Sequence, residues 1–311
     1  MTIESLRADI VEVGRRMYAR GYTASNDGNI SVRLGDDRLL MTPKSVCKGF
    51  MTPDMMCVTD LAGNKIAGDR DPSSEMLMHL EVYRQRPDVK AVVHAHPPTA
   101  TGFAVAGIPL DRAVLAEVLT TLGSIPLAEY ATPSTAELPE AVRKYIKAHD
   151  GMLLANHGAL TVGGDLFSAY YKMETIEHFA KISLVARLLG GENLISREEV
   201  IRLQGLRGTY GIKAPAPICL DPDEPGSDST APVSVAAPKN DVDAASDAAS
   251  CQAVQAPSGT GMRLVPDQID GHRRLSSERH RATGHAGDEA EIRLTYRELS
   301  ALIEDAIKNL R

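Results

Sequence analysis

Apolar residues recur at the spacings of helices and strands through residues 1 to about 213, and then the pattern stops. Residues 214 to 290 are rich in Pro, Ala, Ser and Asp, and they carry too few large apolar side chains to order themselves. The contrast predicts a folded domain over residues 1–213, a flexible linker over 214–290 and an amphipathic helix over 291–311.

Strand-like and helix-like segments alternate within the first of these regions. Leu6, Ile10, Val13 and Met17 lie at helical spacing and predict a helix over residues 4–20. Two serines before residue 75 are suitable N-caps for a helix over 74–86. Further strands are expected over 30–33, 38–41, 91–95, 125–130 and 151–155, and further helices over 113–122, 137–149 and 165–189. This alternation indicates an α/β or α+β layered domain.

The charge and the cysteine pattern narrow the classes of protein. A net charge of -7 argues against binding to nucleic acid or to a membrane surface. No apolar run reaches the 18 residues or more of a membrane-spanning helix, and the charged start of the chain is unlike a signal peptide. Four cysteines without CxxC spacing are typical of free thiols in a reducing compartment, so we expect a cytoplasmic protein.

Two histidines stand two residues apart at the end of the apolar strand over 91–95. Side chains at i and i+2 of a strand point to the same face, so His94 and His96 can present two imidazoles to one metal ion. His157 follows another apolar strand, and Glu75 stands at a helix start where negative charge is favoured. Imidazoles with a carboxylate or water are ligands that Zn²⁺ prefers, so these four residues predict a zinc site.

A second group of polar residues predicts an anion site. Short hydroxyls and exposed backbone N–H groups at a helix start bind phosphate well. The group consists of Asn29, Lys44, Ser45, Ser73 and Ser74, in which Lys44 can add a point charge.

Five ordered motifs within residues 1 to about 213 resemble the class II aldolase/adducin family, nearest to its L-fuculose-1-phosphate aldolase branch. They are Asn26 to Arg33, Met41-Thr42-Pro43, Pro72 to Glu75, His94-Ala95-His96 and Asn156-His157-Gly158. The resemblance implies an α/β fold with a mostly antiparallel central sheet flanked by helices on both faces. It also implies a cyclic homotetramer with active sites between neighbouring subunits.

The resemblance also implies roles for individual residues. The three histidines would bind zinc, Glu75 would be the acid/base residue, and the anion group would hold a substrate phosphate. Tyr210, in a Thr-Tyr-Gly motif, would close the site. A family tyrosine from the adjacent subunit is missing from residues 112–121, where Glu117 is the nearest polar candidate for acid/base chemistry on the aldehyde side.

These roles predict a zinc-dependent aldolase that cleaves a ketose 1-phosphate to dihydroxyacetone phosphate and a short aldehyde. The expected substrate is of the fuculose-, rhamnulose- or 5-deoxyribulose-phosphate type. Two alternatives stay open: a phosphopentulose epimerase or dehydratase of the same family, and a non-catalytic adducin-like assembly module. Related epimerases typically have Asp where this chain has Glu75, which favours the aldolase.

Residues 291–311 carry apolar residues at helical spacing, apart from the folded domain. Ile292, Tyr296, Leu299, Ile303 and Leu310 form a helical apolar stripe after the linker. The arrangement resembles the encapsulation peptides of enzymes packaged in bacterial microcompartments, and implies that residues 291–311 bind a shell protein. An oligomerisation helix, a helix that docks on its own domain and a disordered extension are the alternatives.

Overall fold

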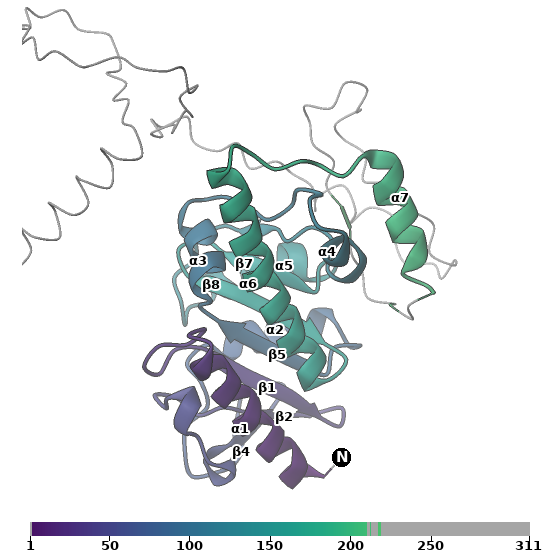
Figure 1. Ribbon diagram of the computed structural model, residues 1–311. Coiled ribbons are helices and arrows are strands. Elements are labelled where there is room, and N and C mark those ends of the chain that lie inside the picture. Colours follow the sequence, from purple (N-terminus) through teal and green to yellow (C-terminus); the bar gives the residue numbers. More distant parts are fainter. Residues whose placement is uncertain (1, 210–211, 213–216, 219–311) are drawn as a thin grey trace, which may run out of the picture. The chain divides into compact units, whose positions relative to one another are not determined.

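The computed structural model describes residues 2–209, 212 and 217–218, and within them eight strands form one sheet (Figure 1). The order across the sheet is β4-β3-β2-β1-β5-β8-β7-β6, so the first strands of the chain occupy one half and the last strands the other. The strands are β1 (Asn29–Leu34), β2 (Arg38–Met41), β3 (Cys57–Asp60), β4 (Lys65–Ala67), β5 (Ala91–Ala95), β6 (Leu127–Ala128), β7 (Gly151–Leu154) and β8 (Gly158–Gly163).

The sheet is mixed, which corrects the mostly antiparallel sheet implied by the sequence. In the order across the sheet, each pair of neighbours from β4 at one edge through to β7 is antiparallel. The last pair, β7 and the edge strand β6, is parallel. The reason is the connection: β6 and β7 are joined by a helical crossover rather than a hairpin, and such crossovers return the chain in the same direction. The strand that carries His94, β5, is central and pairs antiparallel with β1 and β8.

Helices cover both faces of the sheet. The long helices α1 (Ile3–Ala19) and α6 (Leu166–Leu188) lie across one face together with α3 (Pro98–Val105), and their apolar residues join one core with inward residues of the strands (Figure 1). On the opposite face, α2 (Met76–Gln85) and α5 (Glu137–Ile146) form a second core against the sheet. Alternate residues of β5 divide between the two cores: Val93 packs on the α1 and α6 side, and Val92 on the α2 and α5 side.

Several element boundaries differ from the expectation. α2 begins at Met76, so Glu75 is the N-cap residue, and its side chain makes no capping hydrogen bond because it points to the histidines instead. β8, α3, α7 (Arg197–Leu206) and the short 3-10 helices η1 (Lys48–Phe50) and η2 (Pro53–Met55) were not predicted. α4 (Ala116–Thr121) lies within the helix expected over 113–122. Among the described helices, none is both long and apolar enough to cross a membrane.

Two residues expected in the linker pack on the domain. Ile218 is buried beside Leu119 of α4 and Val200 of α7, and the carbonyl of Pro217 accepts hydrogen bonds from the backbone N–H and the hydroxyl of Ser124. The helix predicted over 291–311 lies outside the described residues, as does Tyr210.

Candidate metal centre and substrate pocket

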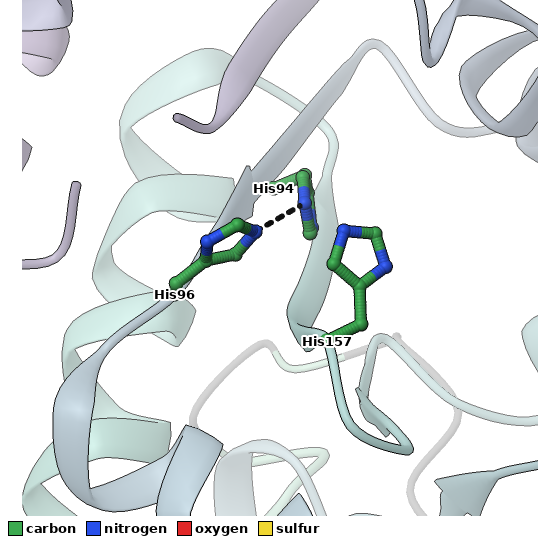
Figure 2. A group of neighbouring side chains, drawn as sticks. All are labelled: His94, His96 and His157. Atoms are coloured by element: carbon green, nitrogen blue, oxygen red, sulfur yellow. Dashed lines mark hydrogen bonds between the residues drawn. The ribbon is translucent and has the colours of Figure 1, made fainter. Parts of the chain in front are cut away.

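Three histidine side chains from two segments of the sheet point toward one another (Figure 2). His94 is on β5, His96 follows the same strand, and His157 lies in the turn between β7 and β8. One ring nitrogen from each histidine lies within 4.8 Å of the others, and the Nε2 atoms of His94 and His96 are 3.2 Å apart. The same-face arrangement predicted for the strand brings His94 and His96 together, and the turn between β7 and β8 adds His157.

The surroundings of these histidines favour neutral rings with a free nitrogen. The Nδ1 of His94 donates to the carbonyl of Ala159 at 2.9 Å, which leaves Nε2 with its lone pair directed at the cluster. Burial lowers the pKa of His94 well below its usual value. Burial also lowers the pKa of His96, whose Nδ1 lies 3.5 Å from a carboxylate oxygen of Asp27. Neutral imidazole is the form that binds a metal ion.

Glu75 completes the cluster from the start of α2. Its Oε1 lies 3.1 Å from Nε2 of His157, and its Oε2 lies 3.3 Å from Nε2 of His94. The side-chain amide of Asn29 donates to the same Oε2 at 2.7 Å. Burial raises the pKa of Glu75, but His94, His157 and the Asn29 amide outweigh burial and hold that pKa well below its usual range. The carboxylate is therefore ionised and acts as a hydrogen-bond acceptor.

The donor set fits a metal ion of the zinc type. Zn²⁺–N distances of about 2.1 Å in a tetrahedral site place two ligand nitrogens about 3.4 Å apart, close to the 3.2 Å between His94 and His96. In the described part of the chain, Oε1 of Glu75 and Nδ1 of His157 are buried atoms without a hydrogen-bond partner. Three imidazoles suit Zn²⁺ better than Mg²⁺ or Ca²⁺, which prefer oxygen ligands.

A cavity of about 330 Å³ opens beside this cluster. All five residues of the predicted anion group line the cavity, so the structure gathers them with Glu75, His96 and His157 around one space. Ser45 has a left-handed φ of 59°, which turns the backbone sharply at the cavity wall. The hydroxyl of Ser73 accepts a hydrogen bond from the backbone N–H of Glu75 at 3.3 Å, which ties the anion group to the metal cluster.

Lys48 is a pocket residue that sequence reasoning missed. It is only 2% exposed, and its ammonium donates to the carbonyls of Asn26 at 3.0 Å and Val46 at 2.7 Å. These bonds join the turn before β1 to the turn after β2, and both turns line the cavity. Burial lowers the pKa of Lys48 to about 8. No sequence pattern marks this residue, because its burial depends on two loops that close over it.

One more residue of the cavity wall was not predicted, and one predicted site residue does not line the cavity. Ser134, with a left-handed φ of 65°, lines the cavity from the segment after β6 and was not singled out. Glu117 is exposed on α4 and is not among the residues that line the cavity. The predicted role of Glu117 involves a neighbouring subunit, so it stays a prediction.

Known proteins resemble this chain in sequence. Residues 8–184 match the family model described as the class II aldolase and adducin N-terminal domain. A 3-oxo-tetronate 4-phosphate decarboxylase of Pectobacterium atrosepticum is 34% identical over 183 residues, which are 58% of this chain and 84% of the relative. An L-fuculose phosphate aldolase of Methanococcus maripaludis is 33% identical over 177 residues, 57% of this chain and 95% of the relative.

The fold agrees as well. A solved L-fuculose 1-phosphate aldolase superposes with a TM-score of 0.61 at 30% identity, over 65% of this chain and 95% of that one. The family match spans more than half of the chain, and it includes every residue of the histidine cluster, Glu75 and the anion group. The chain therefore belongs to the class II aldolase and adducin family, whose aldolase and decarboxylase members identify it as a metal-dependent lyase.

Proposed function

We propose that the chain is a zinc-dependent aldolase that cleaves a ketose 1-phosphate to dihydroxyacetone phosphate and a short aldehyde. The substrate is of the fuculose-, rhamnulose- or 5-deoxyribulose-phosphate type. The observation that carries the proposal is the position of the Glu75 carboxylate, which lies 3.1 to 3.3 Å from two of the three clustered histidines and on the wall of the same cavity as the anion group.

Some residues of the site bind the substrate phosphate or a cation, and Glu75 transfers a proton. Hydroxyls and backbone N–H groups of Ser45, Ser73 and Ser74, with the ammonium of Lys44, hold the phosphate at one end of the cavity. The histidines would hold a cation that supplies Lewis-acid stabilisation of negative charge on the substrate carbonyl oxygen. Cleavage of the bond between C3 and C4 leaves an electron pair on C3. The Glu75 carboxylate takes up a proton from solvent and delivers it to C3.

The other side of an aldol cleavage needs a second proton transfer. The hydroxyl on C4 must lose its proton as the aldehyde forms, and this step requires a base. Residues 112–121 contain no tyrosine, and Glu117 does not line the cavity of its own chain. In the aldolase, we propose that Glu117 of a neighbouring subunit acts as this base.

The position of Glu117 outside the cavity of its own chain favours a second candidate, a decarboxylase of a phosphorylated 3-oxo sugar acid. In such an acid, the carboxylate is attached to the carbon that adjoins the ketone. The bond between the carboxylate and this carbon breaks, the carboxylate leaves as carbon dioxide, and no hydroxyl proton has to be removed. The electron pair stays on that carbon, and Glu75 protonates it to give dihydroxyacetone phosphate. This reaction needs only the residues that one chain brings together, and relatives at 34% identity are named 3-oxo-tetronate 4-phosphate decarboxylases.

A four-substrate product assay separates the two candidates. The zinc-loaded protein is incubated with the 1-phosphates of L-fuculose, L-rhamnulose and 5-deoxyribulose, and with 3-oxo-tetronate 4-phosphate. Dihydroxyacetone phosphate is measured by a coupled dehydrogenase, and aldehyde and carbon dioxide are measured separately. Aldehyde release supports the aldolase, and carbon dioxide release from the acid alone supports the decarboxylase. A pentulose phosphate isomer or no product contradicts both candidates.

Two further proposals concern partners, and both rest on the resemblance described above. We propose that the protein is a homotetramer, which light scattering of the full chain tests directly. We also propose that residues 291–311 direct the enzyme to the shell of a bacterial microcompartment. Deleting residues 290–311 should then abolish co-sedimentation with shell proteins and leave turnover intact. Unchanged co-sedimentation of the deletion variant contradicts the shell proposal.

A further inference from the structure

A ladder of polar side chains runs between α2 and β1, away from the cavity. Glu75, His79 and Tyr83 follow one another at four-residue spacing and face Asn29 and Ser31, two residues apart on β1. Four residues of a helix advance about 6 Å, and two residues of a strand advance about 6.8 Å. The two spacings match closely, so each polar group of the helix meets a partner on the strand.

The hydrogen bonds of the ladder can be followed atom by atom. Asn29 Nδ2 lies 2.7 Å from Glu75 Oε2, and Asn29 Oδ1 lies 2.5 Å from His79 Nε2. His79 Nδ1 lies 2.6 Å from the hydroxyl of Ser31, which lies 2.9 Å from the hydroxyl of Tyr83. The Tyr83 hydroxyl also lies 3.0 Å from the Ser31 carbonyl.

The bond from the Asn29 amide nitrogen to Oε2 of Glu75 sets the donors of this chain. With its nitrogen on Glu75, the amide turns its oxygen to His79, and an amide oxygen only accepts. His79 then donates from Nε2, and its Nδ1 must accept the proton of the Ser31 hydroxyl. The hydroxyl of Tyr83 donates its single proton to the backbone carbonyl of Ser31. The donors therefore run in one direction, from Ser31 through His79 and Asn29 to Glu75.

Burial protects the ladder from competing water. His79 and Ser31 are fully buried, and Tyr83 and Asn29 are at most 3% exposed. Burial lowers the pKa of His79 to about 4, with an opposing effect from Glu75, so the ring is neutral at neutral pH. A neutral ring has a single proton to place, and the ladder places it on Nε2.

We propose that His79 is a positioning residue, which acts through Asn29 to hold the Glu75 carboxylate in its reactive orientation. Without a donor at Nε2 of His79, the amide oxygen of Asn29 loses its partner, and the amide is free to move away from the position in which its nitrogen bonds Glu75. The carboxylate then loses the bond that holds its Oε2, and it is no longer fixed between His94 and His157. The role of this orientation in turnover rests on the proposed function, whereas the orientation itself does not.

The test compares two substitutions of His79 with a matched substitution of another buried histidine. His79→Gln keeps an N–H donor near the position of Nε2, and His79→Leu removes both ring nitrogens. His149→Leu is the control, because His149 is also fully buried and its Nδ1 bonds the carbonyl of Ser124, which does not line the cavity. Thermal stability and zinc affinity are measured for each variant beside kcat and KM.

We expect His79→Leu to lower kcat about 10- to 100-fold, the usual effect of losing a supporting hydrogen-bond partner. KM should change less than about threefold, because the other members of the anion group, Lys44, Ser45, Ser73 and Ser74, do not contact His79. His79→Gln should recover most of kcat, and His149→Leu should lose stability only. Equal kcat for His79→Leu and His149→Leu, or a Gln variant as slow as the Leu variant, overturns the positioning role.

Imidazole ¹⁵N spectroscopy of the metal-free wild-type protein supplies a readout that needs neither turnover nor a variant. The expected spectrum shows His79 with a protonated Nε2 and a bare Nδ1. The opposite tautomer, or two tautomers in exchange, overturns the inference even if the protein is active. The expected tautomer in a protein that processes none of the substrates leaves the ladder intact and contradicts the proposed function instead.

Discussion

Gly158 follows His157 directly and begins β8, where the backbone approaches the neighbouring strand closely. A Cβ added at this glycine would lie 2.5 Å from the carbonyl oxygen of Ala95 and 2.6 Å from Cδ2 of the His96 ring. Carbon atoms pack at about 3.5 Å or more, so a methyl group here requires a displacement of about 1 Å. The first contact is with the backbone, which cannot rotate away, and the second is with one of the clustered histidines.

The expected cost of Gly158→Ala follows from this clash. Forcing an extra carbon into a packed site typically costs about 1–3 kcal/mol. For a domain of this size, 1 kcal/mol corresponds to a shift in melting temperature of about 2–4 °C, so we expect a decrease of about 2–12 °C. Because the His96 ring must also move, we expect zinc affinity to fall by about tenfold or more.

The assay is thermal unfolding of the metal-free protein together with calorimetric zinc titration. Gly164→Ala is the matched control, because Gly164 stands just beyond the other end of β8 and a Cβ there would meet no atom within 4 Å. The control should have the stability and zinc affinity of the wild type. If Gly158→Ala also behaves like the wild type, then close packing of the Asn-His-Gly turn does not position the histidines.

Four further outcomes are expected. Glu75→Gln should bind zinc but lose turnover by about 10²- to 10⁴-fold, and wild-type rates would remove Glu75 from proton transfer. His96→Ala should lose zinc and activity together, and retention of both would refute its assignment as a ligand. Lys48→Met should raise KM, because the two turns that line the cavity are then no longer joined by the hydrogen bonds of Lys48. An unchanged KM would contradict this role of Lys48. The depressed pKa of Lys48, about 8, means that between pH 8 and 10.5 the unfolded chain binds a proton that the folded chain has released. Stability relative to the Lys48→Met variant should therefore rise with pH over this window in urea titrations, and a flat difference contradicts the burial of a charged lysine.

The periodic elements were predictable from the sequence because local patterns decide them. The helices α1, α5 and α6 begin within about two residues of the expected positions, since each carries an apolar stripe over several turns. β8 was missed because glycines stand at both ends of its six residues and resemble turn signals. α3 was missed because it starts at a Pro-Pro pair, although proline is well tolerated in the first turn of a helix.

The pairing of His94 and His96 could be predicted from the local sequence, whereas the ladder between α2 and β1 was not predicted. His94 and His96 share a face by the two-residue period of a strand, which needs no tertiary information. The part played by His79 depends on how α2 docks on β1, a contact across 48 to 52 residues of sequence. The spacing of Glu75, His79 and Tyr83 along one helix face was the signal that could have suggested it. The burial of Lys48 left no such signal.

The central claim is that the histidine cluster and Glu75 together activate the carbon next to the carbonyl of a bound phosphorylated ketone. Exchange of a hydroxymethyl proton of dihydroxyacetone phosphate with D₂O, followed by proton NMR, tests it most directly. This half-reaction is common to the aldolase and the decarboxylase and needs no second substrate. We predict exchange with the zinc-loaded protein, loss of exchange after chelation, and recovery when zinc is restored. Exchange that proceeds equally in the chelated protein, or no exchange in the zinc-loaded protein, contradicts the claim.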